Sequence, residues 1–468
     1  MNEAWARFAT LRESAHPDAA TAIEALVAHG DDVALNRINV LEFAESHDLR
    51  IDHAIGAFLH AARLGLFDMS WNLLCPGCGG VLDAHITLQA VRCDTYSCAL
   101  CAAGYQPTLD EMVEVSFTVS PRVRRIAAHA PDSLSLLEYS RQMYWSSGIR
   151  LPASDEFGRL LDRIVVDSVE LPAGESTVRE LTLPPAFVIV FDPVTHTSRF
   201  IDVQGEPTGE RRDLGVVMKN ESVSHGTVTM APGPLRLTLE NHTARRTLPG
   251  VYIAGHDLHD LLGQRKPFLT GKRLLTNQTF RDLYRTDALD IDQRLKITSL
   301  TFLFSDLIGS TALYERVGDL AAFELVKSHF RLLHEVIGEY SGAVVKTIGD
   351  AVMATFPTPD LGLAAGLRMR TAVRALGRVG DELMLKLGLH EGPCLAVMLN
   401  DRLDYFGQTV NIAARVQGLA GSHAICATEP VVRHVDAARL LGDAGVAPVA
   451  RQRALKGIAG EVTVYEIP

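Results

Sequence analysis

An aspartate flanked by apolar runs is the residue around which the chemistry of this chain is arranged. Residues 344–356 read VVKTIGDAVMATF, in which β-branched and apolar residues stand on both sides of Gly349 and Asp350. This pattern predicts a β-hairpin with a charged residue at its tip. An aspartate beside a glycine usually belongs to the turn itself. Two further stretches make a metal ligand the better interpretation of Asp350.

These two stretches place polar side chains where a strand ends and where a helix begins. Residues 299–311 read SLTFLFSDLIGST, an apolar strand that ends at Asp306 and runs into a loop of small residues. Residues 404–415 read DYFGQTVNIAAR, a loop that opens a helix. Asn411 and Arg415 stand four positions apart in that helix and therefore share one of its faces.

In order, spacing and residue type, the three stretches resemble the catalytic domain of the class III adenylate and guanylate cyclases. The resemblance covers residues from about 296 to 468 and implies an α+β, ferredoxin-like fold, which agrees with the alternating strand and helix patterns there. It implies conversion of ATP to 3′,5′-cyclic AMP and pyrophosphate, in which the ribose 3′-hydroxyl attacks the α-phosphorus. Because this family builds its active site between two catalytic domains, a homodimer with two equivalent sites is expected.

The resemblance assigns the catalytic metal site to Asp306 and Asp350. Two divalent cations, Mg²⁺ or Mn²⁺, are expected to activate the attacking hydroxyl and neutralise the phosphates, and both prefer hard oxygen ligands. Main-chain N–H groups of residues 307–311, at the start of a helix, are expected to hold the phosphates. A simple helix cap is the alternative interpretation of Asp306.

Lys346 and Asp404 match the positions that read the purine in this family. Adenine presents an acceptor at N1 and a donor at N6, which a lysine and an aspartate complement; guanine presents the opposite polarity, and guanylate cyclases typically carry Glu and Cys here. A buried mismatch of donors and acceptors discriminates strongly between bases. Asp401 is also acidic, but Asp404 stands three residues before Gly407, as the family pattern requires. ATP is therefore the predicted substrate, with a cyclase of another nucleotide as an alternative.

Three further side chains complete the predicted site. Asn411 and Arg415 match the residues that position the ribose and stabilise charge on the transition-state phosphorane. Lys456 lies in the stretch LKGIAGEVTVYEI near the end of the chain. A contact with the triphosphate and an ordinary solvated lysine explain Lys456 equally well.

Five of the seven cysteines crowd between Cys75 and Cys101. Two pairs, CPGC at Cys75 and Cys78 and CALC at Cys98 and Cys101, are separated by 19 residues. This is the spacing of a zinc site in which each pair bends the chain so that two thiolates face one ion. Four thiolates leave no open position, so Zn²⁺ bound there is expected to be structural. Cys93 has the wrong spacing for such a pair and is interpreted as a spare buried thiol.

The segments around these motifs predict a multidomain chain whose N-terminal domains regulate the cyclase. Residues 1–70 read as helical, and residues 40–67 fit either a helix-turn-helix or an ordinary helical bundle. The remaining predicted segments are a zinc ribbon at 71–110, a connector at 111–166, an all-β sandwich at 167–258, a linker helix at 259–295 and the class III cyclase domain at 296–468.

Charge and hydropathy argue against several classes of partner. The net charge of −11, with seven acidic and three basic residues between Asp31 and Ser70, is unfavourable for binding nucleic acid or anionic membranes. The most apolar short run, AFVIVF at 186–191, is too short to span a bilayer, and the N-terminus shows no signal-peptide pattern. A cytoplasmic protein is expected. A zinc-containing regulator that uses a cyclase fold only as a nucleotide sensor is the alternative from a different class.

Overall fold

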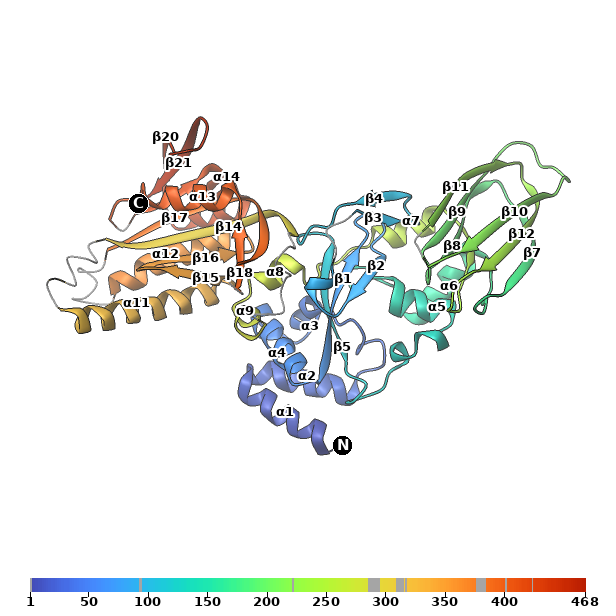
Figure 1. The fold of residues 1–468 in the computed structure, drawn as a ribbon, viewed down its shortest axis with the longest axis horizontal. Helices are drawn as coiled ribbons and strands as arrows, with labels where there is room; N and C mark the ends of the chain where they lie inside the picture. Colours follow the sequence, from blue (N-terminus) through green and yellow to red (C-terminus); the bar gives the residue numbers. More distant parts are fainter. Residues whose placement is uncertain are drawn as a thin grey trace. The chain divides into compact units, whose positions relative to one another are not determined.

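The chain forms two compact units that are interleaved in sequence (Figure 1). The computed structural model describes residues 2–91, 95–220, 223–284, 295–308, 315, 318–375, 384–399, 402–422 and 424–468. The first unit, called the N-terminal unit below, consists of Met1–Pro107 and Glu111–Leu269. The second, called the catalytic unit, consists of Thr108–Asp110 and Thr270–Pro468. Cys93, Asp401 and residues 309–311 of the predicted phosphate loop lie outside the described residues.

The N-terminal unit begins with four helices. They are α1 (Asn2–Ser14), α2 (Pro17–His29), α3 (Val40–Ser46) and α4 (Ile51–Arg63). The second helix of the helix-turn-helix pattern, α4, is buried without interruption from Ala54 to Leu59, and its Phe58 ring contacts the rings of Phe67 and Phe117. A recognition helix needs an open face to enter a DNA groove. The helical-bundle interpretation is therefore the one that agrees with the packing.

A small antiparallel sheet follows, and it extends into the predicted connector. Its strands, in the order β2-β1-β5, are β1 (Phe67–Leu74), β2 (Val81–His85) and β5 (Val113–Val119), and the cysteine-rich segment adds the hairpin of β3 (Tyr96–Cys98) and β4 (Ala103–Tyr105). β5 pairs with β1 along its whole length, so the first part of residues 111–166 belongs to this sheet. The rest carries α5 (Leu136–Tyr139), a π-helical turn at Ser140–Tyr144 and α6 (Ser154–Ile164).

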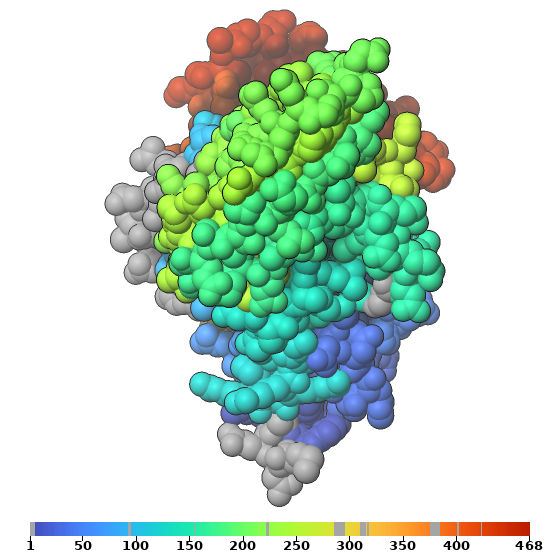
Figure 2. Space-filling view, turned by 90° about the vertical axis from the view of Figure 1, so that its right-hand side faces the viewer, coloured from blue at the N-terminus to red at the C-terminus, as the bar shows by residue number. Residues whose placement is uncertain are grey.

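The β-rich segment forms two sheets around a shared apolar core. The three-stranded sheet has the order β10-β12-β7 and the five-stranded sheet the order β11-β9-β8-β13-β6. The strands are β6 (Val165–Ser168), β7 (Ser176–Leu183), β8 (Ala186–Asp192), β9 (Thr197–Val203), β10 (Arg212–Met218), β11 (Val223–Met230), β12 (Gly233–Asn241) and β13 (Gly250–Ile253). Leu235, Leu237 and Leu239 of β12 alternate toward the core, as a strand with one buried face requires. Figure 2 shows these segments, in green, packed into a continuous surface.

Short helices stand where the sequence predicts a single linker helix. They are α7 (His256–Gly263), α8 (Gly271–Leu275) and α9 (Gln278–Leu283). Pro267 lies between α7 and α8, and the side chains of Thr270 and Asn277 cap the first turns of α8 and α9. Proline and side-chain caps interrupt a helix because each removes or competes for a backbone hydrogen bond. The linker is therefore segmented rather than continuous over its described part.

The catalytic unit is one mixed sheet with helices on both faces. Its strands run in the order β15-β16-β14-β17-β19-β21-β20, and β18 pairs with β17. They are β14 (Leu295–Ile308), β15 (Ala343–Ile348), β16 (Ala351–Phe356), β17 (Met384–Leu399), β18 (Arg402–Phe406), β19 (Ile425–Thr428), β20 (Val449–Ala454) and β21 (Glu461–Ile467). The helices are α11 (Asp319–Glu339), α12 (Pro359–Ala375), α13 (Gln408–Gln417), α14 (Glu429–Arg433) and α15 (Val435–Asp443).

The order β14-α11-β15-β16-α12-β17 is the βαββαβ arrangement that the sequence predicts for this segment. Leu303 and Leu387 point into a core shared with α11, α12, α14 and α15. The opposite face is covered by α13, whose Val416 packs with Cys426 and Val464. Among the described residues, no helix is both long and apolar enough to cross a membrane.

Three residues from the N-terminal part of the sequence are built into the catalytic unit. The Leu109 N–H donates to the carbonyl of Lys296, at 3.0 Å, and its carbonyl accepts from the N–H of Lys272, at 2.8 Å. The Asp110 carboxylate forms an ion pair with Lys272 at 3.2 Å, and both side chains are largely buried. The segment Thr108–Asp110 thus joins α8 to the first strand of the catalytic sheet.

Candidate active site

Asp306 and Asp350 lie at the same end of the central strands. β14 pairs with β16 as far as Ser305↔Val352, so Asp306 comes level with the start of β16. β15 and β16 form the predicted hairpin, with Ile348 opposite Ala351 across the turn. Gly349 takes a φ of 64°, a left-handed conformation that glycine adopts without a Cβ clash. The strand register therefore brings together the two residues predicted to hold the metal.

The electrostatics around Asp306 reflect this proximity. Partial burial raises the pKa of Asp306, and the Asp350 carboxylate raises it further. The side chain of Gln417 and the charge of Lys386 oppose this rise. Two carboxylates that the fold holds together against their repulsion form a hard-oxygen donor set, and a divalent cation such as Mg²⁺ or Mn²⁺ would fit it.

Lys346 and Asp404, which lie 58 positions apart in the sequence, form an ion pair. Lys346 Nζ lies 2.5 Å from Asp404 Oδ2, and the other oxygen of Asp404 accepts from the N–H of Tyr405 at 2.9 Å. The lysine side chain is 40% exposed and the aspartate side chain 9%. The pair therefore presents a donor and an acceptor side by side, with access from one side.

The helix α13 carries the predicted catalytic residues Asn411 and Arg415. Asn411 is exposed and Arg415 half-buried. The Arg415 guanidinium reaches the β20–β21 turn, because a Cβ on Gly457 would lie 3.5 Å from its Nη2. Lys456, the neighbour of Gly457, is exposed in the same turn. Within the described part of one chain, no hydrogen bond or ion pair joins these residues to Asp306 or Asp350.

A pocket of about 250 Å³ opens beside Lys346, and α9 contributes to its wall. Arg281 of α9 donates to the Leu403 carbonyl at 2.7 Å, and its guanidinium lies over the Tyr405 ring at 5.8 Å. Gln278 accepts from the N–H of Val344 at 2.8 Å. The helix α9 thus clamps the two strands that carry Lys346 and Asp404.

The sequence reasoning missed three residues of this site. Gln417 stands two positions after Arg415, at the end of the same helix. Its polar side chain faces Asp306, and that polarity was the only feature of the sequence that could have indicated a role in the site. Gln278 and Arg281 lie in the segment interpreted as a spacer or signal-transmitting helix. Asn277 gave a local capping signal for that helix, but nothing local indicated which strands the helix contacts.

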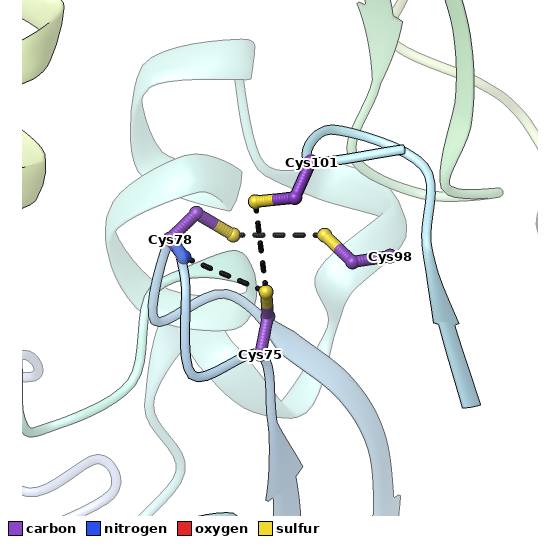
Figure 3. A group of neighbouring side chains, drawn as sticks. All are labelled: Cys75, Cys78, Cys98 and Cys101. Carbon is purple, nitrogen blue, oxygen red and sulfur yellow. Dashed lines mark hydrogen bonds between the residues drawn. The ribbon is translucent and has the colours of Figure 1, made fainter. Parts of the chain in front are cut away.

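The four predicted zinc ligands meet at one point in the N-terminal unit (Figure 3). The Sγ atoms of Cys75 and Cys101 lie 3.6 Å apart, those of Cys78 and Cys98 lie 3.7 Å apart, and all four Sγ atoms lie within 4.8 Å of one another. Zinc–sulfur bonds of about 2.3 Å in a tetrahedral site require sulfur atoms about 3.8 Å apart. The arrangement fits a closed four-thiolate metal site, and the distances exclude disulfides, which need about 2.05 Å.

The thiols interact strongly with one another and with their apolar surroundings. Hydrogen bonding with Cys101 is the largest influence that lowers the pKa of Cys75 and Cys78, and the same thiol raises the pKa of Cys98. Cys75, Cys78 and Cys98 belong to an apolar core with Trp145 and Phe191. The cysteine cluster therefore joins the small sheet to the β-rich segment within this unit.

Two family models match the chain. Residues 293–465 match the model described as the adenylate and guanylate cyclase catalytic domain, and with the fold and site above this confirms the recognition of a class III cyclase domain. Residues 1–282, which are more than half of the chain, match the model described as a family of unknown function, DUF5939. The chain belongs to that family.

Curated relatives match part of the chain. The chain is 33% identical over 132 residues to adenylate cyclase 2 of Rhizobium meliloti, covering 25% of this chain and 36% of the relative. It is 27% identical over 188 residues to an adenylate cyclase of Anabaena cylindrica, covering 36% of each. Guanylate cyclase 32E of Drosophila melanogaster is 29% identical over 144 residues, covering 28% of this chain and 12% of the relative. The chain thus spans about a third or less of the length of these relatives.

Solved structures of cyclases also align with part of the chain. The adenylyl cyclase CyaB of P. aeruginosa aligns with a TM-score of 0.33 and 22% identity, over 38% of this chain and 96% of that chain. The guanylate cyclase domain of RhGC from Catenaria anguillulae, in complex with GTP, aligns with a TM-score of 0.33 and 19% identity, over 37% of this chain and 97% of that chain.

Proposed function

We propose that the chain is an adenylate cyclase, which forms 3′,5′-cyclic AMP and pyrophosphate from ATP. The observation that carries this proposal is the ion pair of Lys346 and Asp404. Adenine inserted against the pair would accept from Lys346 Nζ at N1 and donate from N6 to Asp404. Guanine would present a donor to the lysine and an acceptor to the carboxylate, and both mismatches would be penalised at a half-buried site.

The reaction itself requires stabilisation of charge on the phosphates. The ribose O3′ forms a bond to the α-phosphorus, the bond from that phosphorus to the bridging oxygen breaks, and the hydroxyl proton and pyrophosphate leave. Asp306 and Asp350 would hold two Mg²⁺ or Mn²⁺ ions, which when bound activate the hydroxyl and neutralise the triphosphate. Asn411 would orient the ribose, Arg415 would donate to the phosphorane as its charge develops, and Lys456 would contact the triphosphate.

A homodimer completes the site in this proposal. Within one chain, Arg415 reaches the turn of Lys456 and has no bond to Asp306 or Asp350 among the described residues. Two copies related by a two-fold axis would form two sites, each with the carboxylates of one copy and the base-reading and α13 residues of the other.

The cysteine cluster is proposed to hold a structural Zn²⁺ ion, and the N-terminal unit to regulate the cyclase. Four thiols within one ligand sphere leave no position for a substrate, which supports a structural role. Binding free energy at such a site contributes directly to folding. The ion would then keep the small sheet and the β-rich segment together.

The decisive experiment identifies the product. Purified full-length protein is incubated with each nucleoside triphosphate in Mg²⁺ or Mn²⁺, and products are separated by chromatography and identified by mass. Cyclic AMP from ATP, formed much faster than cyclic GMP from GTP, supports the proposal. A preference for GTP contradicts the base assignment. Nucleotide binding without any cyclic product supports the alternative, a nucleotide sensor.

A further inference from the structure

One arginine of α9 contacts both strands that carry the proposed base-reading pair, Lys346 and Asp404. Arg281 Nη2 donates to the carbonyl of Leu403 at 2.7 Å and lies 3.5 Å from the carbonyl of Val345. Leu403 directly precedes Asp404 in β18. Val345 directly precedes Lys346 in β15. A single guanidinium therefore contacts the residue before each of the two side chains.

The strands β15 and β18 are joined to different neighbours in the sheet. β15 pairs with β16, and β18 pairs with β17. The ion pair of Lys346 and Asp404 links their side chains, but a bound base must open that pair. The contacts of Arg281 link the backbones of the same strands and need not open for a base to bind. Arg281 is therefore a link that can hold the spacing of the two strands while a base is bound.

The packing beside these strands leaves open space. The pocket of about 250 Å³ beside Lys346 is also lined by Val344, Arg281 and Leu403. Atoms that border an open pocket lack protein neighbours on that side and gain no attraction from it. Hydrogen bonds from α9, and not close packing, therefore hold β15 and β18 at this point.

A β-bulge stands directly before Lys346. In the ladder of β15 and β16 the register shifts between Val344 and Lys346, which leaves Val345 as an extra residue. Gln278 Oε1 accepts from the Val344 N–H at 2.8 Å, and Arg281 contacts the carbonyl of Val345. Bulges change the direction of neighbouring side chains and are common beside active sites. The helix α9 therefore holds the backbone feature that directs Lys346.

Arg281 is itself held in place. Its guanidinium lies over the Tyr405 ring, 5.8 Å from the ring centroid, which is an attractive arrangement for a cation. Tyr405 is 3% exposed, and its hydroxyl donates to the Leu275 carbonyl at 3.3 Å. The Asn277 side chain caps the first turn of α9. An arginine that is anchored in this way can fix a distance between the groups that it contacts.

We propose that Arg281 is a positioning residue for base recognition, which sets the separation of Lys346 and Asp404 at which adenine bonds to both. This inference rests on the proposed adenylate cyclase function. Arg281 acts through the backbones of β15 and β18 and does not touch the base. Sites of this kind require their groups within about 0.5 Å of the productive geometry. Loss of the arginine therefore weakens the preference for adenine over guanine.

Binding of nucleotides that cannot be cyclised tests this role. 3′-Deoxy-ATP and 3′-deoxy-GTP lack the attacking hydroxyl, so calorimetric titration of the full chain in Mg²⁺ measures base preference without turnover. In Arg281→Met, the Kd for 3′-deoxy-GTP divided by that for 3′-deoxy-ATP should fall about tenfold or more, because both backbone contacts are lost. Arg281→Lys can still donate to the Leu403 carbonyl and should keep part of the preference. A loss of folded protein reduces the binding capacity for both nucleotides alike and does not change this ratio.

Arg370 of α12 provides the matched control. It is also half-buried and also donates to a backbone carbonyl, that of Ile467, at 3.1 Å. Arg370→Met should therefore keep the wild-type ratio.

An adenine preference that is undiminished in Arg281→Met, or in Arg281→Lys should the methionine variant not fold, would overturn the inference and leave the proposed function intact. A wild-type chain that does not prefer 3′-deoxy-ATP would overturn both the inference and the base assignment on which it rests.

Discussion

At the proposed base-reading position, a lysine and an aspartate neutralise each other, and a bound base would have to separate them. A nucleobase must replace the bond between Lys346 and Asp404 with two bonds of its own. Only a base with an acceptor next to a donor, in the right order, recovers both. Every base must therefore break the bond between Lys346 and Asp404. Only adenine is expected to replace it with two new hydrogen bonds.

Exchanging this pair should change the nucleotide preference. Lys346→Glu with Asp404→Cys removes both complements of adenine and supplies an acceptor for the guanine edge. The ratio of kcat/KM for ATP to that for GTP should fall by on the order of a hundredfold or more. Initial rates of cyclic nucleotide formation from both substrates measure it. Lys327→Ala, on the exposed face of α11, serves as the control, and an unchanged ratio in the double variant would contradict the assignment.

A half-buried histidine should make the catalytic unit sensitive to mild acid. Burial lowers the pKa of His390 from 6.5 to about 4, and its Nδ1 shares a hydrogen bond with Thr428 at 2.7 Å. The unfolded chain takes up the proton at higher pH than the folded chain does. The stability that neutral His390 contributes is therefore complete above pH 6.5 and is lost as the pH falls toward about 4.

Melting temperatures measured between pH 4.5 and 7 test this expectation. His390→Gln removes the titrating group while keeping a side chain that can bond to Thr428, so its melting temperature should depend less steeply on pH than that of the wild type. Thr428→Val keeps the histidine and should retain the slope. Identical slopes for the wild type and His390→Gln would show that other groups account for the acid sensitivity.

At the scale of elements, local sequence patterns predicted the turns and strands that are determined by residues close together in the sequence. The Gly349–Asp350 hairpin and the strand ending near Asp306 are confirmed, because turn chemistry and alternation are local signals. The pairing of β5 with β1 and the contact of α9 with β15 and β18 were not predicted. These contacts join segments far apart in sequence, and nothing in one segment encodes its distant partner.

The candidate site likewise contains residues that the sequence indicated and residues that only the packing reveals. The resemblance to the class III cyclases indicated Asp306, Asp350, Lys346 and Asp404. The strand register brings the first two together, and an ion pair joins the other two. Gln417 acts on Asp306 from another element, and Arg281 contacts β15 and β18 from α9. Such features follow from packing, which a periodic pattern does not specify.

The prediction at the scale of elements concerns zinc binding by the cluster of four cysteines. Cys75→Ser with Cys98→Ser should lower bound zinc from about one ion per chain to almost none, and should lower the melting temperature because ligand binding supports folding there. Elemental analysis of dialysed protein measures the metal. Cys394→Ser with Cys426→Ser changes two buried thiols outside the cluster and should leave the zinc content intact. Wild-type protein without zinc would rule out the assignment.

At the scale of the whole molecule, the dimer proposal predicts complementation. Asp306→Ala disables the carboxylate site and Asp404→Ala disables the base site, so each variant alone should be inactive. A heterodimer of the two would contain one intact site and one site with both lesions. Random pairing of equal amounts gives about half heterodimers, so activity should recover to about a quarter of wild type if the sites act independently.

This experiment needs proof that subunits exchange. Native mass spectrometry of differently tagged variants, before and after mixing, provides it. Recovery of cyclic AMP formation together with heterodimers supports a shared site. Heterodimers that stay inactive would mean that each chain builds its site alone.

The insertion of Thr108–Asp110 into the catalytic unit limits how the two halves of this chain can be recombined. A chimera that joins a foreign sensor at a single point before α8 would carry Lys272 without the carboxylate of Asp110, and β14 without the backbone partner that Leu109 provides. The opposite chimera, in which this N-terminal unit is joined to a foreign cyclase domain, would leave Leu109 without the backbone of β14 and Asp110 without Lys272. A single crossover could therefore not transfer either unit intact. We expect the N-terminal unit and the catalytic unit to be inherited together.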